Sequence, residues 1–133
     1  MKIGIVVSEF NYDINMMMLE LAKEHAAFLE AEVSDVVKVP GIFEVPVTAK
    51  KLLGKVDGVV ALGAVIEGET DHDEVIINQA ARKLMDISLE TGKPVGFAIT
   101  GPGMTRQQAQ NRIENAKHAV EVVVKMHKRL AAI

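Results

Sequence analysis

The chain has 133 residues, 49% of them hydrophobic, which is the size of one compact domain over residues 1–133 and too apolar for a disordered protein. Its net charge of −3 excludes the basic surface of a nucleic-acid-binding protein, and the lack of cysteine excludes disulfides, thiolate metal sites and cysteine nucleophiles. No apolar run approaches the ~20 residues of a membrane span, and residues 1–10 resemble a strand rather than a signal peptide, so we expect a cytoplasmic protein without membrane partners.

Short apolar runs alternate with longer amphipathic stretches in the first half of the chain. The β-branched run at 2–7 predicts a buried strand, and 13–30 predicts a helix with apolar positions at helical spacing. A second strand is expected at 33–39. The proline-bounded segment 40–46 predicts a loop or helix entry, and the short helix after it ends at Gly54.

The second half continues the same alternation. It predicts a strand at 56–65, a helix at 72–91, a strand at 93–100, a turn at 101–105 and a last helix from about 105 to 131. Strands that are apolar on both faces and joined by helices predict an α/β fold with a four-stranded parallel sheet covered on both sides. Ligands bind such sheets beyond the carboxyl ends of the strands. The loops of interest are therefore 8–13, 40–46, 64–73 and 99–106.

Two of these loops carry residues with two open interpretations. Phe10 stands in a polar loop, where it either packs beneath the loop or offers a flat face on which a planar ring stacks, and the sequence favours neither. Glu44 either complements the N-terminus of the following helix, which is the commoner role, or accepts hydrogen bonds from ligand hydroxyls.

The octet GETDHDEV at 68–75 places His72 among four carboxylates. A metal site is disfavoured, because adjacent helical positions point apart and no second histidine lies at a helical offset. Gly68 and Thr70 precede a helix start with Asp71 as the expected N-cap, and exposed N–H groups at such a start bind phosphate. Nearby carboxylates favour the protonated imidazole, which suits a proton donor. The residues alone slightly favour the alternative, an exposed histidine in an acidic first turn.

The loop ITGPGMT at 99–105 precedes a helix that carries Arg106 and Arg112, with Lys117 five residues further on. An arginine can hold a phosphate through two parallel hydrogen bonds. Surface helices of many proteins carry arginines, so this pattern by itself indicates little.

Three segments, VPGIFEVP, ALGAVIEGETDHDEV and GPGMTRQQAQNRIENAKHA, occur in an order and at a separation that resemble the 6,7-dimethyl-8-ribityllumazine synthases of archaeal type. The resemblance covers essentially the whole chain. It implies a transferase-class enzyme that joins 5-amino-6-(D-ribitylamino)uracil to 3,4-dihydroxy-2-butanone 4-phosphate, in riboflavin synthesis, with no metal and no redox cofactor. It also implies a flavodoxin-like, three-layer α/β/α sandwich.

The resemblance further implies a role for each matching residue. The substrate-binding residues would be Phe10, Ile42, Phe43, Glu44, Ala64, Val65, Ile66, Phe97 and Lys117. Phe10 would stack on the pyrimidinedione, Glu44 would accept bonds from the ribityl hydroxyls, and residues 64–66 would offer backbone groups to the ring edge. The phosphate-binding residues would be Glu69, Thr70 and Arg112, with Lys117 near the same anion, and His72 would move protons. The site would lie between neighbouring subunits of a pentamer, which in this family often builds a 60-subunit icosahedral shell.

The chain departs from many bacterial members at Glu9 and Glu67, where those members carry arginine. Both changes put negative charge near an anionic substrate, so we expect the carboxylates from Glu67 to Glu74 to point away from the phosphate. The separation of Arg112 and Lys117 is also shorter than in many members.

Four other functions fit parts of the pattern less well. A signalling receiver needs an aspartate at the carboxyl end of the third strand, where LGAVIEG has none, and a flavodoxin needs a Ser/Thr/Gly-rich loop where SEFNYD stands. A purely structural shell protein would need only the assembly. The related archaeal riboflavin synthase is disfavoured by the GET-x-H motif.

Overall fold

The computed structural model describes residues 1–67 and 72–133. Among these, a four-stranded, all-parallel sheet has the order β2-β1-β3-β4. Its strands are β1 (Lys2–Ser8), β2 (Glu32–Val39), β3 (Gly58–Ile66) and β4 (Val95–Met104). The helices are α1 (Tyr12–Phe28), α2 (Val45–Leu52), α3 (Asp73–Thr91), α4 (Arg106–Gln110) and α5 (Asn115–Ala131), and η1 (Ile42–Glu44) is a 3-10 turn.

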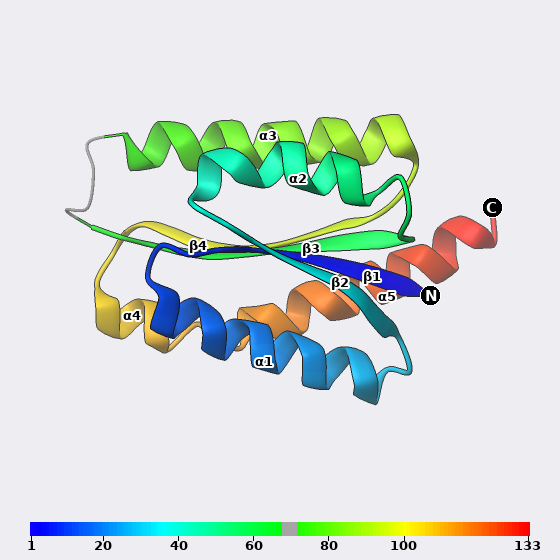
Figure 1. Cartoon of the computed structure of the whole chain (residues 1–133), viewed down its shortest axis with the longest axis horizontal. Coiled ribbons are helices and arrows are strands. Elements are labelled where there is room, and N and C mark those ends of the chain that lie inside the picture. The colour runs from blue at the N-terminus through cyan, green and yellow to red at the C-terminus, as the bar shows by residue number, and fades with distance from the viewer. Residues whose placement is uncertain (68–71) are drawn as a thin grey trace.

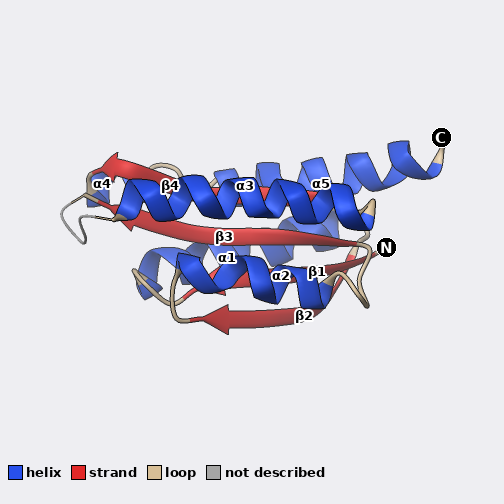
Figure 2. Cartoon of the chain, turned by 90° about the horizontal axis from the view of Figure 1, so that it is seen from above, coloured by secondary structure: helices blue, strands red, loops and turns tan. Residues whose placement is uncertain are grey.

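The helices cover both faces of the sheet. Figure 1 shows α2 and α3 on one face and α1, α4 and α5 on the other. Seen from above, α3 runs along β3 and β4, and α2 lies beside it towards β1 and β2 (Figure 2). The predicted three-layer α/β/α sandwich is therefore confirmed. None of the helices described above has the length and apolarity that crossing a membrane requires.

Two hydrophobic clusters, one on each face of the sheet, form the core. Alternate residues of β3 enter opposite clusters, so that Val60 and Leu62 pack towards α1 and α5, whereas Val59 and Ala61 pack towards α2 and α3. This two-sided burial explains why the strand is a continuous apolar run. At Gly96 a Cβ atom would lie 2.6 Å from the carbonyl oxygen of Ala119, so α5 rests directly on β4.

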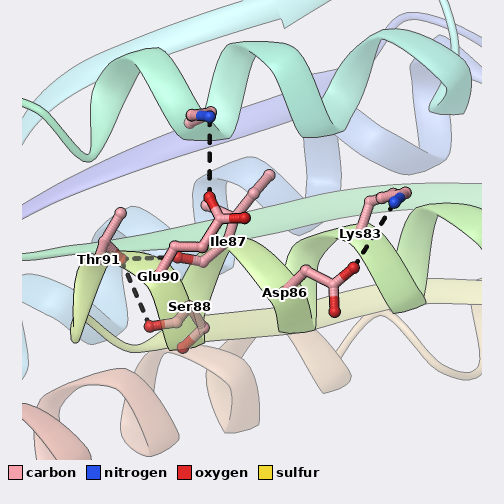
Figure 3. Close-up of polar contacts among 7 residues, drawn as sticks. Lys83, Asp86, Ile87, Ser88, Glu90 and Thr91 are labelled. Atoms are coloured by element: carbon pink, nitrogen blue, oxygen red, sulfur yellow. Dashed lines mark hydrogen bonds and ion pairs between the residues drawn. The ribbon is translucent and has the colours of Figure 1, made fainter.

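An ion pair joins α2 and α3 above the sheet. Glu90 of α3 forms an ion pair with Lys50 of α2 at 3.7 Å, and the Thr91 hydroxyl donates to the Ile87 carbonyl at 2.8 Å near the helix end (Figure 3). Gly92, with φ of 68°, then ends α3 as the sequence predicts.

The predicted turn at 101–105 is wrong, because most of it belongs to β4. Met104 pairs with Ile66 after a register shift, so the strand continues past the Gly-Pro-Gly segment. The extra residues of this shift form a bulge in β4, where Gly101 and Gly103 adopt φ values of 115° and 77° that other residues rarely reach.

The single long helix predicted from about 105 to 131 is also wrong, because α4 and α5 are separate. Between them Arg112 bonds to Ala109 and Asn115 bonds to Arg112, both in the tighter i to i−3 pattern. The apolar spacing continues across this turn, so the hydrophobic pattern alone did not reveal it. The start is as expected, since Thr105 caps α4 in a capping box with Gln108.

Candidate functional site

A cavity of about 150 Å³ lies at the carboxyl ends of β1 and β3. The chain leaves β1 towards β2 on one side and later returns to place β3 on the other, so this is the switch point of the sheet, where such folds bind ligands. The lining comes from the loop after β1, η1, the end of β3 and the start of α3. Its residues are Phe10, Gly41, Ile42, Phe43, Ala64, Val65, Asp73, Ile76 and Ile77.

The cavity is apolar, with two open aromatic rings among its lining residues. Phe10 is 54% exposed and Phe43 is 78% exposed, so neither ring is buried under its loop. Among the described lining residues, Asp73 alone carries a charge. An apolar cavity with exposed aromatic faces can take a planar heterocycle by stacking.

Glu44 lies at the edge of this cavity, in the N-cap position of α2. A Cβ atom at Gly41 would lie 3.4 Å from the Glu44 carboxylate, so this carboxylate folds back towards a residue of the cavity lining. Glu44 also lines an adjoining groove of about 470 Å³, which shares Phe43 and Ile76 with the cavity. The carboxylate is thus placed to accept hydrogen bonds from a chain attached to a ring in the cavity.

His72 occupies the N-cap position of α3 and is exposed. The predicted N-cap, Asp71, and the predicted phosphate-binding residues Glu69 and Thr70 lie outside the described residues, as does Gly68. The backbone N–H of Glu67 donates to the Met104 carbonyl at 2.8 Å, so the end of β3 is fixed against β4.

The expectation that the carboxylates from Glu67 to Glu74 point away from the phosphate stays a prediction, but one of them, Asp73, borders the apolar cavity. Glu67 and Glu74 are exposed, and so is Glu9, but Asp73 is half-buried and contributes to the lining. Asp73, Ile76 and Ile77 have the i, i+3, i+4 spacing of one helix face. That spacing was available in the sequence and would have identified all three.

Three of the predicted residues lie away from this cavity, as far as the described residues define it. Phe97 is on the edge strand β4, opposite Ala61, and is 42% exposed. Arg112 is exposed in the turn between α4 and α5, and Lys117 of α5 pairs with Glu114 at 3.3 Å. Both lie in the layer opposite α2 and α3 (Figure 1). One chain therefore brings together Phe10, Ile42, Phe43, Ala64 and Val65, with Glu44, Ile66 and His72 adjacent.

An ion pair joins the helices on the other face at the same end of the sheet. The Arg106 guanidinium of α4 donates to the Asp13 carboxylate of α1 and lowers the pKa of that carboxyl. In the parts of the chain that the structure describes, no three histidine or acidic side chains are grouped so as to hold a metal ion.

Comparison with known proteins gives one family. The model of the 6,7-dimethyl-8-ribityllumazine synthase family matches residues 1–131. A protein of that name from Methanothermobacter thermautotrophicus is 56% identical over 131 residues, which cover 97% of this chain and 94% of its own length. The protein of that name from Archaeoglobus fulgidus is 60% identical over 131 residues, which cover 97% of this chain and 92% of its own length. The protein of that name from Methanocaldococcus jannaschii is 54% identical over 99% of this chain and 95% of its own. The chain belongs to the 6,7-dimethyl-8-ribityllumazine synthase family.

Proposed function

We propose that the protein condenses 5-amino-6-(D-ribitylamino)uracil with 3,4-dihydroxy-2-butanone 4-phosphate to give 6,7-dimethyl-8-ribityllumazine, phosphate and two waters. The observation that carries this proposal is the family match over residues 1–131. The apolar cavity at the switch point supports it, because an exposed aromatic ring in its lining can stack on a flat pyrimidinedione. The reaction requires neither a metal nor a redox cofactor.

Each residue near the cavity has a role in this proposal. Phe10 stacks on the pyrimidinedione, and Ile42 and Phe43 contact the ribityl side. Glu44 accepts hydrogen bonds from the ribityl hydroxyls. The main chain of Val65 and Ile66 meets the ring edge. So does the main chain of Ala64, whose carbonyl also accepts a bond from the Asn11 side chain at 2.8 Å.

The chemistry needs positioning and proton transfer rather than an enzyme nucleophile. The substrate amine attacks the ketone, and loss of water gives an imine. Phosphate then leaves as an enol forms, and ring closure with a second loss of water gives the product. His72 moves protons in these steps, which is worth about 10²- to 10⁴-fold. Holding both reactants in one pocket lowers the barrier by a further ~7–11 kcal/mol.

We infer that the active site is completed by a second copy of the chain. Phe97, Arg112 and Lys117 would serve the cavity of a neighbour, where Arg112 and the main chain of Glu69 and Thr70 hold the phosphate. Large exposed apolar side chains on η1, α2 and α3 support such an assembly. They are Phe43, Val47, Val75, Met85 and Leu89.

The assembly we propose is a cytoplasmic pentamer, which can associate further into a 60-subunit shell. Native mass spectrometry should give five times the 14.4 kDa mass of one chain, or sixty times that mass. A monomer that is fully active would contradict the shared site.

The function is tested by mixing purified protein with both substrates and following lumazine absorbance and phosphate release together. We expect equal molar amounts of both products, formed faster than in the spontaneous reaction without protein. Omission of either substrate is the control. A rate no higher than the spontaneous one would refute the proposal.

A further inference from the structure

The loop after β1 carries the Phe10 ring, which packing alone holds weakly because more than half of it is exposed. We call residues 9–11 the platform loop. The backbone N–H of Glu9 donates to the Val39 carbonyl at 2.8 Å, at the end of β2. The backbone N–H of Phe10 reaches the Ser8 hydroxyl at 3.2 Å. Two asparagine side chains make further hydrogen bonds that hold this loop in place.

Asn15, one turn into α1, lies fully buried beneath the platform loop. Its Nδ2 donates to the carbonyl of Ser8 at 2.7 Å and to the carbonyl of Phe10 at 2.5 Å. Both hydrogens of one amide are thus used on the backbone that presents the aromatic ring. A flipped amide would set its oxygen against two carbonyl oxygens, so the orientation is unambiguous.

The oxygen of the same amide is buried and finds no hydrogen-bond partner among the described residues. A buried unpaired carbonyl is destabilising, and an apolar side chain of similar volume would fill the space without it. Such an apolar side chain would, however, leave the carbonyls of Ser8 and Phe10 without their donors. What asparagine contributes at this position is therefore the pair of hydrogen bonds to the loop.

Asn11 fixes the other end of the platform loop. Its backbone is left-handed, with φ of 59° and ψ of 51°, which asparagine tolerates better than most residues. Its Nδ2 donates to the carbonyl of Ala64 at 2.8 Å, across to the end of β3. Ala64 lines the cavity, so this bond sets the spacing between the loop and the wall that faces it.

We propose that Asn15 and Asn11 are positioning residues, which hold the Phe10 ring in its stacking position before the pyrimidine arrives. This inference rests on the proposed function, because it concerns how the Phe10 ring is ordered before the pyrimidine binds. A ring that is already ordered does not lose conformational freedom on binding, so affinity for the pyrimidine rises.

The first test replaces Asn15 by leucine, which has the same branching at Cγ but larger terminal groups, and removes both donors. We expect KM for the ribitylaminouracil to rise about tenfold, the size expected when one side chain must be ordered on binding. Both kcat and KM for the butanone phosphate should change less than about threefold. The matched control is Ile14→Ala, which perturbs the buried residue next to Asn15 and removes no hydrogen bond to the loop. It should lower Tm at least as much and leave both KM values unchanged.

A double-mutant cycle separates positioning from general damage. If Asn15 acts through the ring, Asn15→Leu should raise KM less than about twofold in a Phe10→Ala protein. Additive effects of the two changes would overturn the inference. A KM in Ile14→Ala that rises as in Asn15→Leu would overturn it as well.

Asn11 provides a second route should Asn15→Leu fail to fold. Asn11→Gly keeps the left-handed backbone and removes the bond to Ala64, and Asn11→Asp keeps the shape but sets an oxygen against that carbonyl. Both should raise KM for the ribitylaminouracil in the same direction. Wild-type KM values in both variants would overturn the part assigned to Asn11.

The experiments distinguish a failure of this inference from a failure of the proposed function. An active wild-type protein with an unchanged KM in the variants refutes the inference alone. If the wild-type protein forms no lumazine, the proposed function fails. The inference is then decided by calorimetric titration of ribitylaminouracil into wild-type, Asn15→Leu and Ile14→Ala proteins.

Discussion

The two ends of the sheet use their polar groups differently. At the amino end, Asp57 accepts the backbone N–H of Lys2 at 2.7 Å, and the Lys93 ammonium donates to the carbonyls of Leu53 and Val56 at 2.6 and 3.0 Å. At the carboxyl end, aromatic rings stay exposed and a histidine occupies an exposed helix start. The amino end therefore uses polar side chains to satisfy backbone groups, whereas the carboxyl end has similar bonds from Asn11 and Asn15 and also borders a cavity with exposed aromatic rings.

The largest expected effect is a loss of kcat when the histidine at the carboxyl end of the sheet, but not the one at the amino end, is replaced. His72→Ala should lower kcat about hundredfold, because a proton donor is lost, with little change in KM or Tm. The control is His127→Ala, since His127 lies on α5 near Asp57, at the amino end. Steady-state kinetics should show kcat within about twofold of wild type for this control. Equal losses in both variants would remove the distinction between the ends.

Arg112→Ala should act next most strongly, through the phosphorylated substrate. Loss of a charge-assisted contact of about 1.5–3 kcal/mol should raise KM for the butanone phosphate about tenfold or more, and leave KM for the pyrimidine nearly unchanged. Arg129→Ala, an exposed arginine in the last turn of α5, serves as the control. Should His72→Ala and Arg112→Ala show the same kinetic pattern, the division of roles between them is wrong.

Lys93→Met tests the amino end for stability. The variant leaves two carbonyls without their charged donor, so the free energy of unfolding should fall by about 2 kcal/mol while kcat stays at the wild-type value. Lys50→Met provides the comparison, because the exposed Lys50–Glu90 pair contributes ~0–1 kcal/mol. Urea unfolding measures both. A large loss of activity in Lys93→Met would show that the ends are coupled.

The smallest expected effect is on stability, and its dependence on pH and salt distinguishes Asp57 from Asp13. The Lys2 N–H lowers the pKa of Asp57, and the Arg106 guanidinium lowers the pKa of Asp13. A lowered folded pKa gives stability that is present above the ordinary value of 3.8 and is lost as the pH falls through the folded value. Asp57→Asn and Asp13→Asn should therefore destabilise slightly at pH 7 and not at pH 2.

Salt at 1 M should abolish the Asp13 effect and leave the Asp57 effect, because the pair between exposed charges is screened. Thermal unfolding at low salt and at 1 M salt measures both effects. A salt-sensitive Asp57 effect beside a salt-resistant Asp13 effect would contradict this prediction.

The sequence predicts the strands and the main helices because burial on both faces leaves continuous apolar runs and burial on one face leaves a helical period. It does not predict the extension of β4 through Gly101–Met104, since a register shift depends on a neighbouring strand. The separation of α4 from α5 is missed for a similar reason, as the apolar spacing continues through the turn. At the site, the motifs predict Phe10 and His72, and the helical spacing of Asp73 with Ile76 and Ile77 could have added Asp73. The role of Asn15 becomes evident only once α1 is placed beneath the loop.

The presence of two hydrophobic clusters, one on each side of the sheet, has a consequence for how this fold can diverge. The inward side chains of α2 and α3 belong to one cluster, which leaves their outward side chains exposed, and Asn15 beneath the platform loop lies on α1, on the side of the other cluster. Substitutions that alter contacts between copies can therefore accumulate on α2 and α3 without disturbing the packing beneath Phe10. The support beneath the Phe10 ring and the outer surfaces of α2 and α3 are in this way open to separate selection.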